Sequence, residues 1–271
     1  MNHVGIEPRE SIGVMSVATN IYLDYWKSMV RSADGLTNVI DEVTFFVFTD
    51  KPEEAEKFAL ELKHVRVRAF KIPQYGWPEA TLLRYQIFDS YNASLDSKIL
   101  MHLDADMLFA SNPWSRVRAQ LSRNSVCLVE HPGFWRPTGV SRLILYVLRP
   151  VLAYKDLRLR IKRGGLGAWE CDTKSSAFVA RESRTKYFCG GTWFGKRDSI
   201  IKLINELSIK VNDDSKKNII AIWHDESHIN RWAIENRHSN ENPELCFDQT
   251  YPQIKKLTPA IIAVRKSEKT R

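Results

Sequence analysis

Short apolar runs alternate along this chain with segments in which apolar residues recur every three or four positions. The apolar runs lie at residues 11–18, 43–50, 65–72, 97–103, 125–130 and 187–195, and the helical spacing lies at 21–32, 52–62 and 81–91. Short apolar runs are typical of strands, and their alternation with helices is typical of an α/β fold. We therefore expect a mixed central sheet with helices on both faces.

Length and composition place the chain among compact globular proteins. It has 271 residues, of which 44% are hydrophobic and 27% are charged. There is no internal repeat or low-complexity linker, so we expect one domain over residues 1–271. No apolar run approaches the roughly 20 residues that span a bilayer, and residues 1–11 lack the apolar core of a signal peptide. We expect a soluble cytoplasmic protein whose four cysteines, which have no paired spacing, are reduced.

The positive charge is concentrated in one segment. The net charge is +8, and residues 136–163 supply seven of these charges because they hold eight basic residues and one acid, Asp156. The segment is also rich in leucine, isoleucine and valine. We expect an insertion at about 136–165, made of two basic amphipathic pieces that would suit an anionic membrane surface. A solvated insertion that only covers the core is an equal alternative. A second basic segment, 265–271, ends the chain.

Two aspartates follow an apolar strand in the sequence KILMHLDADMLF, residues 98–109. In open α/β sheets, ligands bind beyond the carboxyl ends of strands, where Asp104 and Asp106 would lie. Mn²⁺ and Mg²⁺ take a few carboxylates together with substrate phosphates and water. The pair therefore predicts a metal that positions a diphosphate, although Asp-x-Asp by itself is common in loops.

The sequence WHDESHIN, residues 223–230, holds Asp225 and Glu226 between two histidines. His224 and His228 are four residues apart and could share one face of a helix as zinc ligands. The zinc-protease pattern, however, needs glutamate directly after the first histidine, and no third ligand is evident. We therefore interpret this segment as a carboxylate pair.

A third segment, YFCGGTWFG at 187–195, combines two glycines with aromatic residues. Gly190 and Gly191 would let the backbone approach a ligand closely, and the aromatic rings could stack on a sugar. Taken alone, the segment is also typical of a glycine-kinked core strand.

In this order, the three segments resemble glycosyltransferase family 6, which includes the mammalian blood-group A and B transferases and the α-1,3-galactosyltransferases. The resemblance runs from about residue 12 to residue 266. It also covers IGVMSVATNIYLDYW at 12–26, FTD at 48–50, Trp77 followed seven residues later by Arg84, and HPGF at 131–134.

The resemblance implies a GT-A fold and a role for each matching residue. The uracil of UDP would be surrounded by Val17, Ala18, Thr19 and Tyr22. Mn²⁺ or Mg²⁺ would be held against the diphosphate by Asp104, which would also lie near the ribose, and Asp106, while Lys266 would bind the phosphates. Arg84 and Asp225 would hold hydroxyls of the donor sugar, and Glu226 would lie beneath its anomeric carbon. The acceptor would be bound by His131, Phe134, Trp223 and Asp248.

The implied reaction is transfer of GalNAc or galactose from a UDP-sugar, in α linkage and by the family's pattern α-1,3, to a galactose-containing glycan. The anomeric configuration would be retained. Negative charge would grow on the diphosphate and positive charge at the anomeric carbon. Glu226 could attack to give a covalent intermediate or only shield an ion pair, and the sequence leaves both routes open.

The donor preference is expected to depend on Cys189, Gly190 and Gly191, which match the family's strand that faces the C2 substituent of the donor sugar. Gly191 has no side chain and Cys189 has a small one, so an N-acetyl group would have room. We expect UDP-GalNAc to be preferred over UDP-galactose by roughly tenfold. Replacement of Gly191 by alanine should then shift the preference toward UDP-galactose.

Two departures from the family bear on its biology. Animal members carry a transmembrane anchor and act in the Golgi lumen, whereas this chain begins a few residues before its first strand. Many bacterial members replace the metal-binding acids by asparagines, whereas this chain keeps Asp104 and Asp106. We expect a soluble microbial or viral enzyme of the cytoplasm, in peripheral contact with a membrane through 136–165. A truncated animal enzyme of the Golgi lumen is the alternative, which the long insertion disfavours.

Two other functions remain open. A glycogenin-like retaining hexosyltransferase also uses Asp-x-Asp, but WHDESH has no place in it. A non-enzymatic module that binds membranes or nucleic acid would use the basic insertion and leave the carboxylates unexplained. We expect no nucleic-acid partner.

Overall fold

Seven strands form the main sheet of this computed structural model, which describes residues 10–38, 41–76 and 78–264. They are β1 (Ile12–Val17), β2 (Val43–Thr49), β3 (Val65–Lys71), β4 (Ile99–Leu103), β6 (Val126–Glu130), β7 (Phe188–Lys196) and β8 (Ser239–Glu241). Their order across the sheet is β3-β2-β1-β4-β7-β6-β8. The sheet is mixed because β1 to β4 are parallel, whereas β7 runs antiparallel to both β4 and β6.

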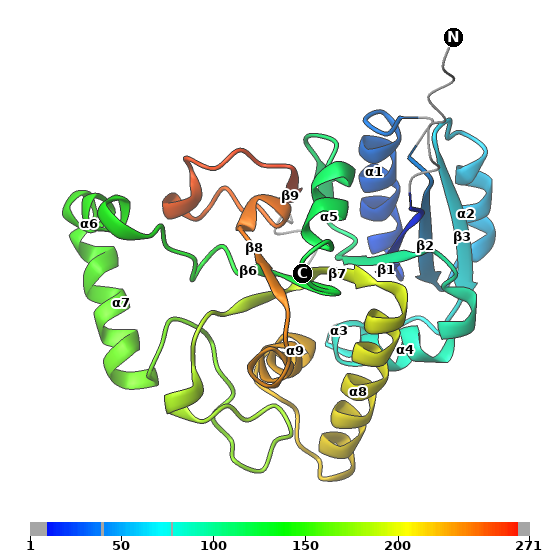
Figure 1. Cartoon of the computed structure of the whole chain (residues 1–271). Coiled ribbons are helices and arrows are strands. Elements are labelled where there is room, and N and C mark those ends of the chain that lie inside the picture. Colours follow the sequence, from blue (N-terminus) through cyan, green and yellow to red (C-terminus); the bar gives the residue numbers. More distant parts are fainter. Residues whose placement is uncertain (1–9, 39–40, 77, 265–271) are drawn as a thin grey trace.

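Helices cover both faces of this sheet (Figure 1). They include α1 (Tyr22–Asp34), α2 (Pro52–Ala59), α3 (Glu79–Leu82), α4 (Arg84–Ser90), α5 (Trp114–Gln120), α8 (Arg197–Lys216) and α9 (His224–Glu235). One core cluster contains residues of α1, α2 and α5, and a second contains residues of α4, α8 and α9. Successive residues of β2 alternate between the two cores, since Phe45 belongs to the first and Phe46 to the second.

The predicted mixed sheet with helices on both faces is confirmed. Each of the six apolar runs matches a strand to within two residues at either end, and the expected helix at 81–91 is divided between α3 and α4. The structure adds a small second sheet, in which β5 (Met107–Phe109) pairs antiparallel with β9 (Ile261–Ala263). Short 3-10 helices lie at η1 (Asn92–Ser94), η2 (Arg181–Ser183), η3 (Pro243–Leu245) and η4 (Pro252–Ile254).

The basic insertion forms two helices, α6 (Gly139–Leu148) and α7 (Pro150–Arg163), at the outer edge of the molecule (Figure 1). Pro150 lies at the first turn of α7, where its missing N–H costs no helical hydrogen bond. The buried carboxylate of Asp156 accepts two hydrogen bonds from Arg136, each 2.6 Å long, and one of 2.8 Å from the hydroxyl of Tyr146. This ion pair ties the two helices to the body of the protein.

Two further expectations concern the chain ends and membranes. Within the described ranges, no helix is both long enough and apolar enough to cross a bilayer. The basic tail at 265–271 lies outside the described residues.

Candidate functional site

The site begins where β4 ends. β4 lies between β1 and β7 in the sheet, so Asp104, which follows β4, lies next to the glycine pair of β7. The N–H of Asp104 donates to the carbonyl of Gly191 at 3.0 Å. Glycine at 191 permits this approach, because a Cβ atom there would lie 2.6 Å from Oδ2 of Asp104.

The amino terminus of α9 lies on the other side of the glycine pair. Asp225 and Glu226 occupy its first turn, directly after His224, whose φ of +47° is unusual for a residue with a side chain. Asn230 joins α9 to β7, since its side chain donates to the carbonyl of Phe188 and accepts from the N–H of Phe188, both at 2.8 Å. A Cβ on Gly190 would lie 2.9 Å from Cβ of Glu226, so glycine also allows the close approach of this helix.

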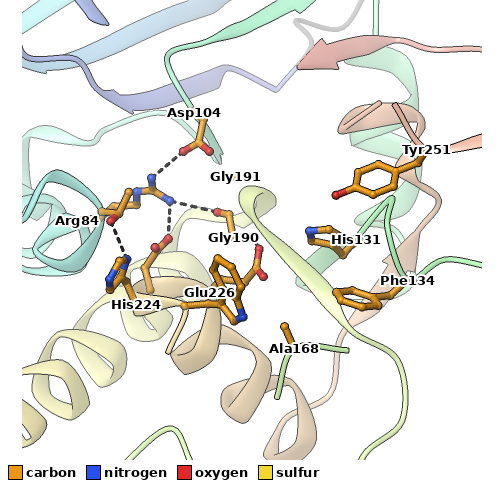
Figure 2. Close-up of a pocket in the computed structure, with 13 residues that line it drawn as sticks. Arg84, Asp104, His131, Phe134, Ala168, Gly190, Gly191, His224, Glu226 and Tyr251 are labelled. Carbon is orange, nitrogen blue, oxygen red and sulfur yellow. Dashed lines mark hydrogen bonds and ion pairs between the residues drawn. The ribbon is translucent and has the colours of Figure 1, made fainter. Parts of the chain in front are cut away.

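A pocket of about 400 Å³ lies between these elements (Figure 2). It is lined by Thr81, Arg84, Asp104, His131, Phe134, Ala168, Gly190, Gly191, Trp223, His224, Asp225, Glu226 and Tyr251. In Figure 2, Arg84 and Asp104 lie across the pocket from a group of three rings, His131, Phe134 and Tyr251. The pocket therefore has a charged side and an aromatic side.

Arg84 organises the charged side. Its Nη2 atom lies 2.6 Å from Asp104, and its Nη1 atom lies 2.5 Å from Asp225 and 3.3 Å from the carbonyl oxygen of Gly190. Burial opposes the charge of Arg84, but the two carboxylates raise its pKa above the ordinary value. The guanidinium is therefore a permanent positive charge that fixes both aspartates.

Glu226 lies between the two sides and both its oxygens accept hydrogen bonds. Tyr187 donates its hydroxyl to Oε1 at 2.8 Å, and the N–H of Gly190 donates to Oε2 at 2.9 Å. Burial raises the pKa of Glu226 to about 7 and that of Asp225 to about 7, and the nearby carboxylate of Asp104 adds to both shifts. A positive charge that develops in this pocket would favour the ionised form of both acids.

The aromatic side is uncharged. His131 and Phe134 have ring centroids 5.0 Å apart, and burial lowers the pKa of His131 to about 4, so its ring is neutral at pH 7. Nδ1 of His131 accepts the N–H of Gly133 at 3.0 Å. Such a surface suits the apolar face of a sugar ring.

The structure brings most of the predicted donor-sugar and acceptor residues to one place. Those that line the pocket are Arg84, Asp104, His131, Phe134, Gly190, Gly191, Trp223, Asp225 and Glu226. Asp248 does not line it, but its charge acts on His131 and it accepts the N–H of Thr250 at 2.8 Å. Their roles stay predictions.

The other predicted residues lie around the pocket or outside the described chain. The four predicted uracil contacts lie at the carboxyl end of β1, where Val17 ends the strand and Ala18, Thr19 and Tyr22 follow it. Because β1 is parallel to β4, they lie at the same sheet edge as Asp104, but they do not line the pocket. Cys189 belongs to β7, is buried in the core cluster that contains α1, α2 and α5, and does not line the pocket. Lys266 lies outside the described residues.

Asp104 lines the pocket, whereas Asp106, two residues further along the chain, does not, and their role as two hard oxygen ligands of a metal stays a prediction. The described part of the chain holds no group of three or more His, Cys, Asp or Glu residues that could bind a metal. Two carboxylates fit a Mn²⁺ or Mg²⁺ ion whose remaining ligands are diphosphate oxygens and water. The histidine pair does not converge: His224 lies in the pocket, 3.3 Å from the hydroxyl of Thr81, whereas His228 is buried 3.8 Å from Asp214.

Sequence reasoning missed some lining residues. Thr81, Ala168 and Tyr251 carry no motif, and only the fold brings them to the pocket. The sequence indicates a role for the ring of Tyr187, whereas in the structure its hydroxyl donates a hydrogen bond to Glu226. Tyr251 stands three residues after Asp248, which is the one sequence signal that could have found it.

Comparisons with known proteins agree with the family resemblance of the sequence motifs. A model of glycosyltransferase family 6 matches residues 166–270, which include β7 and α9. The chain is 23% identical over 88% of its length to "Histo-blood group ABO system transferase 1" of Rattus norvegicus, and 24% identical over 90% to "Globoside alpha-1,3-N-acetylgalactosaminyltransferase 1" of Homo sapiens. It spans 61% and 62% of the length of these relatives. The resemblance inferred from the motifs is thus confirmed.

Proposed function

Because the chain is related to glycosyltransferase family 6, we propose that it transfers GalNAc, or galactose, from a UDP-sugar to a galactose-containing glycan in α linkage, by the family's pattern α-1,3. The proposal rests above all on Glu226, a half-buried carboxylate between a charged and an aromatic pocket wall. This arrangement gives a donor sugar and an acceptor sugar separate surfaces with one acid between them.

The donor would lie against the charged wall. The sugar hydroxyls would meet Arg84 and Asp225, whose mutual ion pair presents both a donor and an acceptor of hydrogen bonds. The nucleotide would extend toward Val17, Ala18, Thr19 and Tyr22 at the end of β1, and Lys266 would bind its phosphates. A bound Mn²⁺ or Mg²⁺ ion would stabilise the negative charge of the departing UDP.

Glu226 would stabilise the positive charge that grows at the anomeric carbon as UDP leaves. Its carboxylate is held by Tyr187 and by the N–H of Gly190, so it does not need to move when that charge forms. Retention of configuration follows if the acceptor attacks from the face that UDP leaves, or if Glu226 first forms a covalent bond to the sugar. Removal of one preorganised contact of this kind typically costs about 3 kcal/mol, or roughly a hundredfold in rate.

The acceptor would lie against His131, Phe134 and Trp223. Asp248 would influence this wall through its charge on His131. A galactose-containing glycan fits because one face of galactose is apolar and can cover a ring, while its hydroxyls remain at the rim.

The test is UDP release from UDP-GalNAc and UDP-galactose with Mn²⁺ and a panel of galactose-terminated glycans, followed by NMR of the product linkage. Glu226→Gln should keep UDP binding and lose at least about a hundredfold in turnover. The control is Glu182→Gln in exposed η2, which should retain full activity. The proposal fails if neither donor releases UDP with any acceptor, or if Glu226→Gln transfers sugar as fast as the parent.

A further inference from the structure

The apolar stripe of α6 is exposed to solvent. Its residues are Val140, Leu143, Ile144, Val147 and Leu148, spaced three and four apart and 48% to 72% exposed. On α7, Val151, Tyr154, Leu157 and Ile161 are spaced in the same way and are 55% to 67% exposed. Amphipathic helices normally bury such a stripe, and contiguous exposed apolar surface of this kind marks an interaction site.

The same two helices and the residue between them carry cations that form no ion pair among the described residues. The cations are Arg142, Arg149, Lys155, Arg158, Arg160, Lys162 and Arg163, and no ion pair among the described residues includes any of them. The one acid in these helices, Asp156, is neutralised by buried Arg136. The exposed apolar stripes are therefore surrounded by uncompensated positive charge.

A polar pocket of about 540 Å³ lies where the two helices meet the body of the protein. Arg142 from α6 and Arg160 from α7 both line it, together with Arg184 and Lys186. The carboxylate of Glu130 in its wall is paired with Lys186. The pocket therefore favours an anionic group such as a phosphate.

We propose that α6 and α7 dock the protein on an anionic lipid bilayer. The apolar stripes enter the boundary between headgroups and acyl chains, and the surrounding cations bind lipid phosphates, which is the arrangement of interfacial amphipathic helices. A second copy of this chain fits the surface less well, because a symmetric pair would place the same seven cations against each other. Nucleic acid would leave the apolar stripes in water.

The docking helices are connected to the pocket of the proposed enzyme. Arg136, which binds Asp156 of α7, also donates to the carbonyls of Gly133 and Trp135 at 3.0 and 2.6 Å, on either side of Phe134. An apolar pocket of about 570 Å³ lies alongside, lined by Leu148, Val151 and Leu152 of the helices and sharing Phe134 and Tyr251 with the site. If the proposed function holds, the acceptor is a glycan carried by a membrane lipid.

Vesicle flotation of the full chain tests the docking without any sugar substrate. Vesicles contain phosphatidylcholine alone or with about one third phosphatidylglycerol. We expect binding to the anionic vesicles that is at least about tenfold tighter than to neutral ones, and that falls in 1 M salt as the screening length shortens to roughly 3 Å. The double variant Leu143→Ser/Val147→Ser should lose at least about tenfold in binding. The control, Ile209→Ser/Ile220→Ser, changes two similarly exposed residues outside α6 and α7. It should bind as the parent does.

Several results would overturn the proposal. They are absence of binding to anionic vesicles, equal binding to both vesicle types, or parent-like binding of the Leu143/Val147 variant. A parent dimer that this variant converts to a monomer in sedimentation would assign the surface to self-association instead. Retention of the parent on immobilised nucleic acid but not on vesicles would also contradict it.

The outcome is separable from that of the proposed function. With active enzyme, the Leu143/Val147 variant should keep the parent rate on a free oligosaccharide and lose at least about tenfold on the same glycan in anionic vesicles. If no UDP is released under any condition, the proposed function fails, while the flotation result still decides the docking.

Discussion

A Cβ atom placed on Gly191 would lie 2.6 Å from Oδ2 of Asp104, closer than real Cβ atoms approach such an atom. The missing side chain at 191 thus makes room for this carboxylate. From the sequence, the same space was assigned to the N-acetyl group of the donor. The preference for UDP-GalNAc stays a prediction, but the structure supplies a second reason for the glycine.

Gly191→Ala should therefore lower kcat/KM for both donors by at least about tenfold, since it displaces Asp104 and the Arg84 that binds it. Kinetics with UDP-GalNAc and UDP-galactose measure this. Gly76→Ala is the control, because a Cβ there has no atom within 4 Å. An unchanged rate with a shift toward UDP-galactose would support the N-acetyl explanation instead.

Arg84→Lys should keep the positive charge and still lose about tenfold to a hundredfold in kcat/KM, because one ammonium cannot bridge Asp104 and Asp225 as the planar guanidinium does. Arg68→Lys, at an exposed ion pair with Asp96, is the matched control and should leave kcat/KM nearly unchanged. Parent-like activity of Arg84→Lys would show that the bridge is not needed.

Removal of divalent metal should abolish sugar transfer, and added Mn²⁺ should restore it. Without a cation, Asp104 and Asp106 would repel the diphosphate. Asp106→Asn should raise the Mn²⁺ concentration for half-maximal activity by about tenfold or more. Undiminished turnover after thorough chelation would contradict a metal requirement.

Turnover should rise with pH through about 7. Burial raises the pKa of Glu226 and Asp225 to about 7, and the proposed reaction needs the ionised form of Glu226. The same raised pKa values make the folding stability fall as the pH rises. The reason is that, at pH values between the unfolded and the folded pKa, the folded protein holds protons that the unfolded chain has released. Between pH 5 and 7.5, kcat should increase while the melting temperature falls, and both should level off once the pH exceeds the folded pKa values of about 7. In Glu226→Gln the fall in melting temperature should be smaller, and an equal fall would exclude Glu226 as its cause.

Tyr187→Phe should move the midpoint of the pH–rate profile upward by about half a unit to one unit, because a hydrogen bond that favours the carboxylate of Glu226 is lost. Tyr146→Phe removes a comparable hydroxyl from a buried carboxylate, Asp156, and should leave the midpoint unchanged. A profile of Tyr187→Phe that overlies the parent profile would mean that this hydrogen bond does not control Glu226.

Much of the fold follows from local pattern. The apolar runs at 43–50 and 97–103 are strands because alternate residues can be buried on opposite faces, and that requirement acts within each run. Asp104 was found for a similar reason, since it follows a strand at the edge where ligands bind, and Asp225 and Glu226 were found as adjacent acids within one short motif. These features depend on neighbours in sequence, so the sequence by itself determines them.

Contacts between distant segments were decided by tertiary structure. Gly191 meets Asp104 because β7 enters the sheet beside β4 in the antiparallel direction, and no periodicity in either segment specifies that pairing. Tyr187 reaches Glu226 because α9 lies against β7, where Asn230 holds it to Phe188. The apolar spacing of α6 predicts a helix, but whether its stripe is covered or faces solvent depends on what packs against it, and here the body of the protein leaves it exposed.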